Sequence, residues 1–138
     1  MSSFWPYGLA VLALVGLVLW LARPVRGEFQ PEAHSGHVRH VVDGDTFYLL
    51  GHNGPIRLWG IDAPELDQAG GEASKRALEA LLSRGAVSCH FIGTDRYGRR
   101  VARCFLEDGR DVGQLMIARG HARELCRYSR GAYGGCST

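Results

Sequence analysis

The stretch HVRHVVDGDTFYLLGHNGPIRLWGI, residues 37–61 of the 138-residue chain, decides the fold class. Residues 37–42 and 46–50 are rich in β-branched and aromatic side chains, and they flank the turn sequence Asp43-Gly44-Asp45. A second turn at residues 51–54 leads into residues 56–61, which have a similar composition. The stretch therefore predicts a meander of three strands.

Beyond this meander the chain predicts two helices and two more strands. Ala and Leu recur at helical spacing over residues 71–83, followed by a glycine stop signal. Residues 86–92 and 100–106 predict strands, and residues 111–119 predict a helix capped by Asp111. We expect a mainly β domain of the α+β class at residues 37–138, a five-stranded OB-fold barrel with two helices. A plain α+β sheet is the alternative.

Residues 4–22 carry no charge and are long enough to cross the hydrocarbon core of a bilayer as a helix. Trp5, Tyr7 and Trp20 lie near the ends of this segment, where aromatic side chains anchor spanning helices at the interface. We expect residues 1–27 to be a single transmembrane signal anchor and the polar residues 28–36 to be a tether. A cleaved signal peptide, which would lead to secretion, is the alternative.

The distribution of charge and the number of cysteines indicate what the domain binds and on which side of the membrane it lies. The formal net charge is only +2, which argues against a uniformly basic nucleic-acid-binding protein. Acidic residues outnumber basic ones in residues 28–94, and Arg residues outnumber acidic ones in residues 95–138. This division suits a site that binds a cation next to a phosphate. Ordinary variation of surface charge is the alternative. Arg23 and Arg26 favour a cytoplasmic domain. The four Cys favour an oxidising compartment, so we expect an extracytoplasmic, periplasmic or extracellular location.

Two segments of the meander contain candidate ligands for ions. Asp43 and Asp45 lie on a strand-to-strand turn and offer oxygen ligands for a hard cation, although Asp-Gly is also an ordinary hairpin turn. Strand alternation points Arg57 toward the barrel interior or its mouth, where a buried charge needs an anion. That anion is either a ligand or a structural ion-pair partner. Asp62 and Glu65 follow at the strand end, with a proline between them.

The turn Asp95-Arg96-Tyr97-Gly98-Arg99-Arg100 is a candidate site for nucleotides. A guanidinium group matches two phosphate oxygens, and the Tyr97 ring offers a flat face for a base. A solvated basic turn is the alternative.

Together these segments resemble the staphylococcal nuclease family. The resemblance rests on D-G-D-T at residues 43–46, R-L-W-G-I-D-A-P-E at residues 57–65 and D-R-Y-G-R at residues 95–99, in this order and separated by a helix. It extends over residues 38–122, nearly the whole expected domain, and it implies an SNase-like OB-fold.

The resemblance also implies a function: Ca²⁺-dependent hydrolysis of phosphodiester bonds in DNA and RNA. It assigns each role to matching positions of this sequence: Ca²⁺ ligands at Asp45, Asp62 and the carbonyl of Ala63; the general base, or orienter of the attacking water, at Glu65; and phosphate binding at Arg57 and Arg99. Beside these, we expect Asp43 to support the cation and Tyr97 and Arg96 to hold the nucleotide. We expect the protein to act as a monomer on DNA or RNA.

The carboxyl end departs from the family pattern. Relatives continue into a long amphipathic helix, whereas residues 128–138 have no helical period, so we expect the C-terminal helix to be truncated. The runner-up function is therefore a catalytically weak or inactive nuclease-like module that binds nucleic acid or protein.

The cysteines leave two states open. Cys89 and Cys104 lie on the two paired strands and form either a cross-strand disulfide or two buried thiols. Cys126 and Cys136 could bridge the tail.

Overall fold

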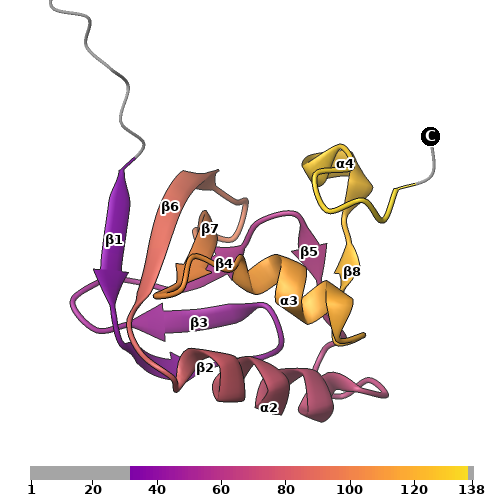
Figure 1. The fold of residues 1–138 in the computed structure, drawn as a ribbon, viewed down its shortest axis with the longest axis horizontal. Coiled ribbons are helices and arrows are strands. Elements are labelled where there is room, and N and C mark those ends of the chain that lie inside the picture. The colour runs from indigo at the N-terminus through magenta and orange to yellow at the C-terminus, as the bar shows by residue number, and fades with distance from the viewer. Residues whose placement is uncertain (1–31, 137–138) are drawn as a thin grey trace, which may run out of the picture. The chain divides into compact units, whose positions relative to one another are not determined.

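Six strands form one curled sheet in the order β1-β6-β7-β4-β3-β2 (Figure 1). Their bounds are β1 Ala33–Gly36, β2 Val38–Val41, β3 Thr46–Leu49, β4 Ile56–Leu58, β6 Val87–Thr94 and β7 Arg100–Leu106. Neighbouring strands are antiparallel except β4 and β7, which are parallel. β1 and β2 stand at opposite ends of this order, yet His37 alone separates them along the chain. The sheet therefore curls into a half-barrel.

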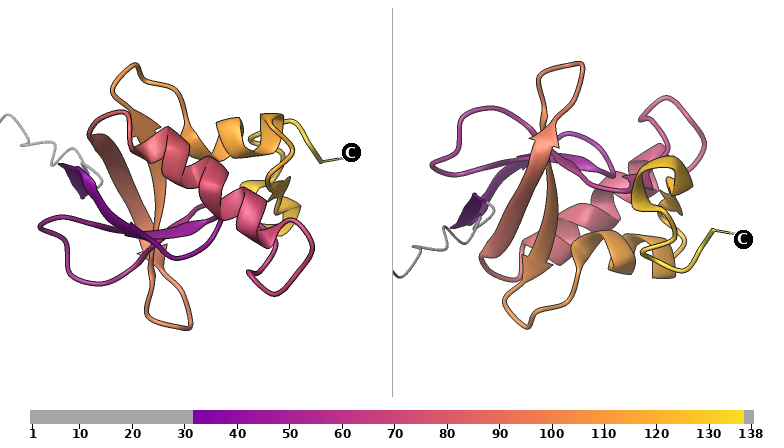
Figure 2. Two further views of the ribbon diagram at one scale, coloured as in Figure 1. Left: turned by 90° about the horizontal axis from the view of Figure 1, so that it is seen from below. Right: turned by 90° about the horizontal axis from the view of Figure 1, so that it is seen from above.

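Three helices and a small two-stranded sheet complete the domain. The helices are α2 Gly71–Leu82, α3 Val112–Ala118 and α4 Cys126–Ser129, and β5 Ile61–Asp62 pairs with β8 Arg123–Glu124. α2 buries one apolar stripe, including Leu78 and Leu81. The Asp111 carboxylate caps α3 by accepting the N–H of Gln114. β8 and α4 lie at the end of the domain away from β1 (Figures 1 and 2).

The core lies between the inner face of the sheet and the helices. Its largest fully buried apolar side chains are Phe47, Leu49, Ile56, Ile61, Leu78, Leu81 and Met116. Cys89 and Cys104 are also fully buried and face each other across β6 and β7, where they form a disulfide. Of the two alternatives that the sequence left open, the structure has the cross-strand disulfide.

The structure, a computed structural model, describes residues 32–136. Within this range the mainly β class is confirmed, both predicted helices form, and the architecture is consistent with an OB-like fold. The third predicted strand, residues 56–61, is interrupted at Gly60, which has φ of +71°. The predicted segments at residues 1–27 and 4–22 lie outside the described residues, among which no helix has the length and apolar character to span a membrane.

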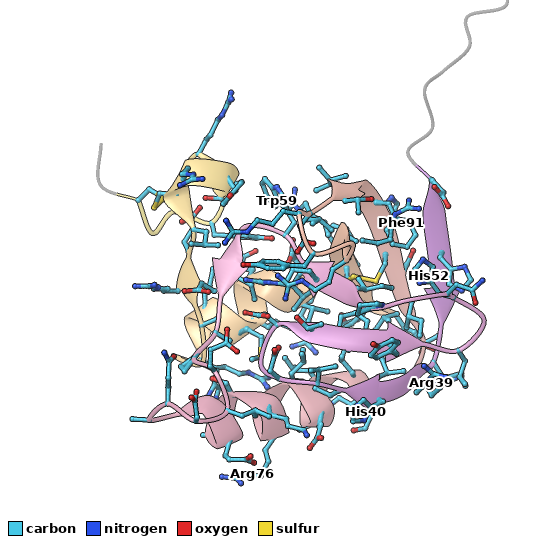
Figure 3. The ribbon with its side chains drawn as sticks, turned by 180° about the vertical axis from the view of Figure 1, so that it is seen from behind. Arg39, His40, His52, Trp59, Arg76 and Phe91 are labelled. Carbon is cyan, nitrogen blue, oxygen red and sulfur yellow. A yellow bond between two sulfur atoms is a disulfide. The ribbon has the colours of Figure 1, made fainter. Side chains whose placement is uncertain are left out.

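The tether predicted for residues 28–36 is wrong for its last four residues. β1, Ala33–Gly36, pairs with β6 through four registered positions. The Glu32 carboxylate forms an ion pair with Arg100 at 2.7 Å. His52 stacks on Phe91 beside this strand, with ring centroids 5.0 Å apart (Figure 3). The folded domain thus begins before His37.

The sequence predicts no helical period over residues 128–138 and a truncated C-terminal helix; within the described residues this region has only the four-residue α4, Cys126–Ser129. A disulfide joins Cys126 to Cys136. Ser129 is buried, and the Tyr133 ring packs near Trp59 with ring centroids 5.8 Å apart. We call residues 126–136 the tail loop.

Candidate active site

A guanidinium group lies between two carboxylates where β4 of the curled sheet leads into β5 of the small sheet. Arg57 Nη2 is 3.2 Å from Asp45 Oδ2 and 3.7 Å from Asp62 Oδ1. The pairing of β3 with β4 sets Thr46 opposite Arg57, so the turn residue Asp45 comes next to the Arg57 side chain. The sheet thus brings together three residues that are up to 17 positions apart in the sequence.

Asp45 is buried, with 5% of its surface exposed. Its carboxylate accepts hydrogen bonds from Thr46 Oγ1 at 3.0 Å and from the backbone N–H of Ala63 at 2.8 Å. Burial raises the pKa of Asp45 to about 6, and the neighbouring charge of Arg57 opposes this rise. Asp43 lies beside it, because its Oδ1 accepts the N–H of Asp45 at 3.0 Å. The carboxylate is therefore costly to ionise unless a further cation lies near it.

Gly44 allows the turn of residues 43–45 to approach Ala63 and α2 closely. A Cβ at this position would lie 2.6 Å from the Cβ atoms of both Ala63 and Ser74. Only glycine fits such an approach without displacing its neighbours. The close contact holds the Asp45 carboxylate against the backbone that follows Asp62.

The expected metal ligands fit a hard cation. The donors are the carboxylates of Asp45 and Asp62 and the backbone carbonyl of Ala63, all oxygen, as Ca²⁺ and Mg²⁺ prefer. The structure places the Asp45 carboxylate on the backbone of Ala63, and Arg57 already neutralises charge between the two acids. By contrast, Glu124, Cys126 and Cys136 lie close together, but the two sulfurs form a disulfide and are not available as thiolate ligands.

A cleft of about 710 Å³ adjoins this cluster. Arg57 lines it together with Arg96, Tyr97 and Arg99 from the turn between β6 and β7. The ion pair of Arg99 with Asp95, at 2.7 Å, fixes the guanidinium, and a 3.4 Å hydrogen bond to Thr46 Oγ1 ties it to β3. The cleft therefore presents several guanidinium groups to one ligand.

Tyr97 is exposed on this turn, with 68% of its surface accessible. The guanidinium groups of Arg96 and Arg99 lie 4.8 and 5.4 Å from the centre of its ring. These contacts orient the ring, and its exposure suits contact with a base.

Glu65 is an expected catalytic residue that neither contacts the cluster nor lines the cleft. It lies exposed in the loop between β5 and α2, where its backbone N–H donates to Gln68 Oε1 at 3.0 Å. Its carboxylate makes no hydrogen bond or ion pair with any residue in the range 32–136.

Three residues that the sequence did not assign to the site also belong to this region. Arg123 binds the Asp62 carboxylate from outside, at 2.8 and 3.1 Å, because β8 pairs with β5. Arg127 and Tyr128 line the cleft from α4. The dipeptide Arg127-Tyr128 repeats Arg96-Tyr97, a signal that could have identified it. Arg123 had no such signal, because its position depends on strand register.

The chain resembles known proteins over most of this domain. A family model described as "Staphylococcal nuclease homologue" matches residues 55–134. The chain is 39% identical over 104 residues to the succinoglycan biosynthesis protein ExoI of Rhizobium meliloti (strain 1021), covering 67% of this chain and 53% of that protein. It is 38% identical over 92 residues to a micrococcal nuclease of Shigella flexneri, covering 65% and 49%.

An uncharacterized endonuclease of Escherichia coli O157:H7 is 36% identical over 89 residues, covering 63% of this chain and 58% of that protein. The chain therefore spans about half of the length of these relatives. The matched family region contains Arg57, Asp62 and Arg99 as well as the tail loop to residue 134.

Proposed function

Because the chain belongs to the staphylococcal nuclease family, we propose that it is a Ca²⁺-dependent nuclease that hydrolyses phosphodiester bonds of DNA, RNA or both. The observation that carries this proposal is the position of Arg57 between the carboxylates of Asp45 and Asp62, beside a cleft that Arg99 also lines. Relatives named endonuclease and micrococcal nuclease support the same reaction class.

Asp45, Asp62 and the carbonyl of Ala63 would hold the cation. When bound, a divalent cation would supply positive charge that offsets the charge building up on the phosphodiester. Arg57 and Arg99 would each bind phosphate oxygens through a guanidinium fork, which fixes the phosphate and stabilises its added charge in the transition state. Asp43 would hold the turn that carries Asp45 through the backbone hydrogen bond of 3.0 Å.

We assign Glu65 the role of general base, which accepts a proton from the attacking water. Its carboxylate is exposed and free of hydrogen bonds among residues 32–136, so it can accept such a proton once substrate is bound. The loop that carries Glu65 would then bring the carboxylate toward the phosphate. Tyr97 and Arg96 would hold the adjoining nucleotide by stacking and charge.

We further propose that residues 4–22 anchor a monomeric chain in a membrane, with the nuclease domain on the extracytoplasmic side. All four Cys form disulfides, which supports an oxidising compartment. Reporter fusions after Thr138 test the membrane face: a reporter that is active only in the cytoplasm would contradict this location.

The test of the nuclease function uses the full chain, purified in mild detergent, with labelled DNA and RNA oligonucleotides. We expect cleavage with Ca²⁺ and none with chelator, and we expect Glu65→Gln to slow turnover at least about hundredfold while the fold is retained. A folded protein that binds the oligonucleotides but never cleaves them would favour the alternative, a nuclease-like binding module.

A further inference from the structure

Two Arg-Tyr pairs line the same cleft. Arg96-Tyr97 comes from the turn between β6 and β7, and Arg127-Tyr128 comes from α4. In each pair the guanidinium lies over the neighbouring ring, 4.8 and 5.3 Å from its centre. The roles proposed above use only the first pair. The cleft thus contains a second group of the same chemistry on another element.

The four arginines of the cleft fall into two classes. Arg57 and Arg99 have carboxylate partners within ion-pair distance. Within residues 32–136, neither Arg96 nor Arg127 lies within 4.0 Å of a carboxylate oxygen, and both are exposed. Two unpaired guanidinium groups in one cleft match a ligand that carries more than one phosphate.

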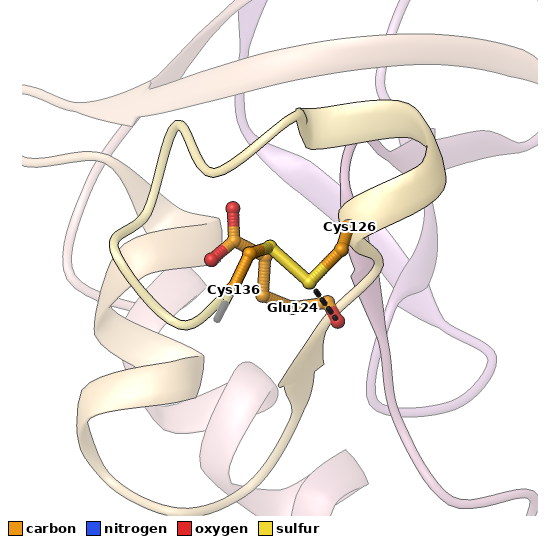
Figure 4. Close-up of side chains that lie close together, drawn as sticks. All are labelled: Glu124, Cys126 and Cys136. Carbon is orange, nitrogen blue, oxygen red and sulfur yellow. Dashed lines mark hydrogen bonds between the residues drawn. A yellow bond between two sulfur atoms is a disulfide. The ribbon is translucent and has the colours of Figure 1, made fainter. Parts of the chain in front are cut away.

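The arginines of the tail loop are not neutralised by the neighbouring Glu124, because hydrogen bonds within the loop occupy its carboxylate. Glu124 is the only acidic residue from Gly120 to the carboxyl end. Its carboxylate accepts the hydroxyl of Ser129 at 2.5 Å and the N–H groups of Tyr133 and Gly135 at 2.9 and 2.6 Å. These bonds hold the pKa of Glu124 below its ordinary value against the opposing effect of desolvation. Figure 4 shows Glu124 beside the disulfide that closes the loop.

The tail loop is also docked on the connection that follows Arg57. The N–H of Leu125, the residue directly before the tail loop, donates to the carbonyl of Gly60 at 2.8 Å. A Cβ on Gly60 would lie 3.1 Å from Ser129 and 3.2 Å from Tyr133, so the loop rests directly on this glycine. The disulfide therefore fixes a wall of the cleft and not a free end.

We propose that Arg127, held in the cleft wall by the Cys126–Cys136 disulfide, binds a second phosphate of a single nucleic-acid strand, next to the phosphate bound by Arg57 and Arg99. This inference rests on the proposed nuclease function. It predicts that longer strands gain affinity from Arg127, that this gain depends on the disulfide, and that substrates with one phosphate do not use it.

The test measures binding by fluorescence anisotropy in chelator, where no cleavage is expected, with the full chain in mild detergent. The probes are a single-stranded octanucleotide and a dinucleotide that carries one phosphate. We expect Arg127→Ala to weaken octanucleotide binding about fivefold, the effect of one exposed charge pair. The slope of log Kd against log salt should fall by about 0.7. Dinucleotide binding should not change.

The matched control is Arg130→Asn. Arg130 belongs to the same loop and carries the same charge, but it does not line the cleft. Its φ is +52°, a conformation that Asn tolerates. Equal losses of affinity in Arg127→Ala and Arg130→Asn would overturn the proposal in favour of general charge attraction.

The disulfide is tested with the double variant Cys126→Ser, Cys136→Ser. We expect this double variant to bind the octanucleotide about as weakly as Arg127→Ala does. Adding Arg127→Ala to the double variant should weaken its binding little further, because both changes act on the same contact. Circular dichroism confirms the fold of each variant, and Arg127→Ala decides the question alone if the double variant does not fold. An octanucleotide affinity unchanged in Arg127→Ala, or no octanucleotide binding by the wild type, overturns the inference. The nuclease function is decided separately by the Ca²⁺-dependent cleavage assay described above.

Discussion

Asp45→Asn tests the electrostatics of the site through the stability of the fold. Burial raises the pKa of Asp45 to about 6 in the folded protein, from an ordinary value of 3.8. The folded state therefore holds the Asp45 proton more tightly than the unfolded chain. Consequently the wild type loses stability as pH rises between about 4 and 6, and the full penalty is present above pH 6. At about 1.4 kcal/mol per pKa unit, this penalty is about 3 kcal/mol.

Asn at this position has nearly the same size and can still accept the N–H of Ala63, but it does not titrate in this range. Urea unfolding of the full chain in chelator, from pH 4 to pH 7.5, gives the free energy of unfolding of both proteins. Between pH 4 and pH 7.5 we expect the stability of the wild type relative to Asp45→Asn to fall by about 2 to 3 kcal/mol, because part of the penalty is already present at pH 4.

Added Ca²⁺ should stabilise the wild type at pH 7 more than it stabilises Asp45→Asn, because ligand binding to the folded state raises stability. A difference between the two proteins that stays constant across this pH range would refute the account of a strained, buried carboxylate. A wild type that gains stability relative to the variant as pH rises would refute it as well.

Three further predictions concern activity and packing. Arg99→Ala should lower turnover at least about hundredfold, as expected when a group that stabilises transition-state charge is removed, whereas the exposed Arg110→Ala should leave turnover unchanged in the same cleavage assay. Tyr133→Phe should lower the free energy of unfolding by about 1 kcal/mol, because the hydroxyl donates to Asp111 at 3.4 Å; an unchanged urea midpoint would contradict this role. Gly60→Ala should lower the free energy of unfolding, measured with urea, by about 2 kcal/mol or more, because φ is +71° and the added methyl group meets the tail loop. An unchanged free energy of unfolding would contradict the docking of the tail loop on Gly60.

Local patterns predicted the elements whose signals are periodic. α2 and β7 form where spacing and composition placed them, and Asp111 caps α3. β1 was missed because Ala33–Gly36 is polar and has no strand-like alternation; its pairing with β6 depends on residues more than 50 positions away. Local composition cannot report such non-local hydrogen bonds.

The break at Gly60 was missed for the same physical reason, and the folded tail loop was anticipated only as a possible bridge between Cys126 and Cys136. A glycine with positive φ interrupts β4 and β5 where the loop docks, and the loop itself is held by a disulfide and by Glu124, not by an apolar period. None of these features leaves a periodic signal in the sequence.

The candidate site was predicted more fully than the scaffold around it. Asp45, Asp62 and Arg57 lie together because β3 pairs with β4 and the chain continues from β4 into β5. The ion pairs of Arg57 with these two acids are one of the two alternatives that the sequence left open for its partner. Arg123 was missed because strand register alone brings it to Asp62. The Glu65 side chain lies on a loop, and the contacts of a loop residue with a substrate are not determined by sequence spacing.

The most direct test of the central claim is the rate at which the full chain cleaves a labelled single-stranded oligonucleotide in Ca²⁺, compared with Asp62→Asn and Arg57→Ala. We predict Ca²⁺-dependent cleavage by the wild type and a loss of at least about hundredfold in each folded variant. Cleavage that persists in chelator, or at an undiminished rate in both variants, would contradict the assignment of the chemistry to this cluster.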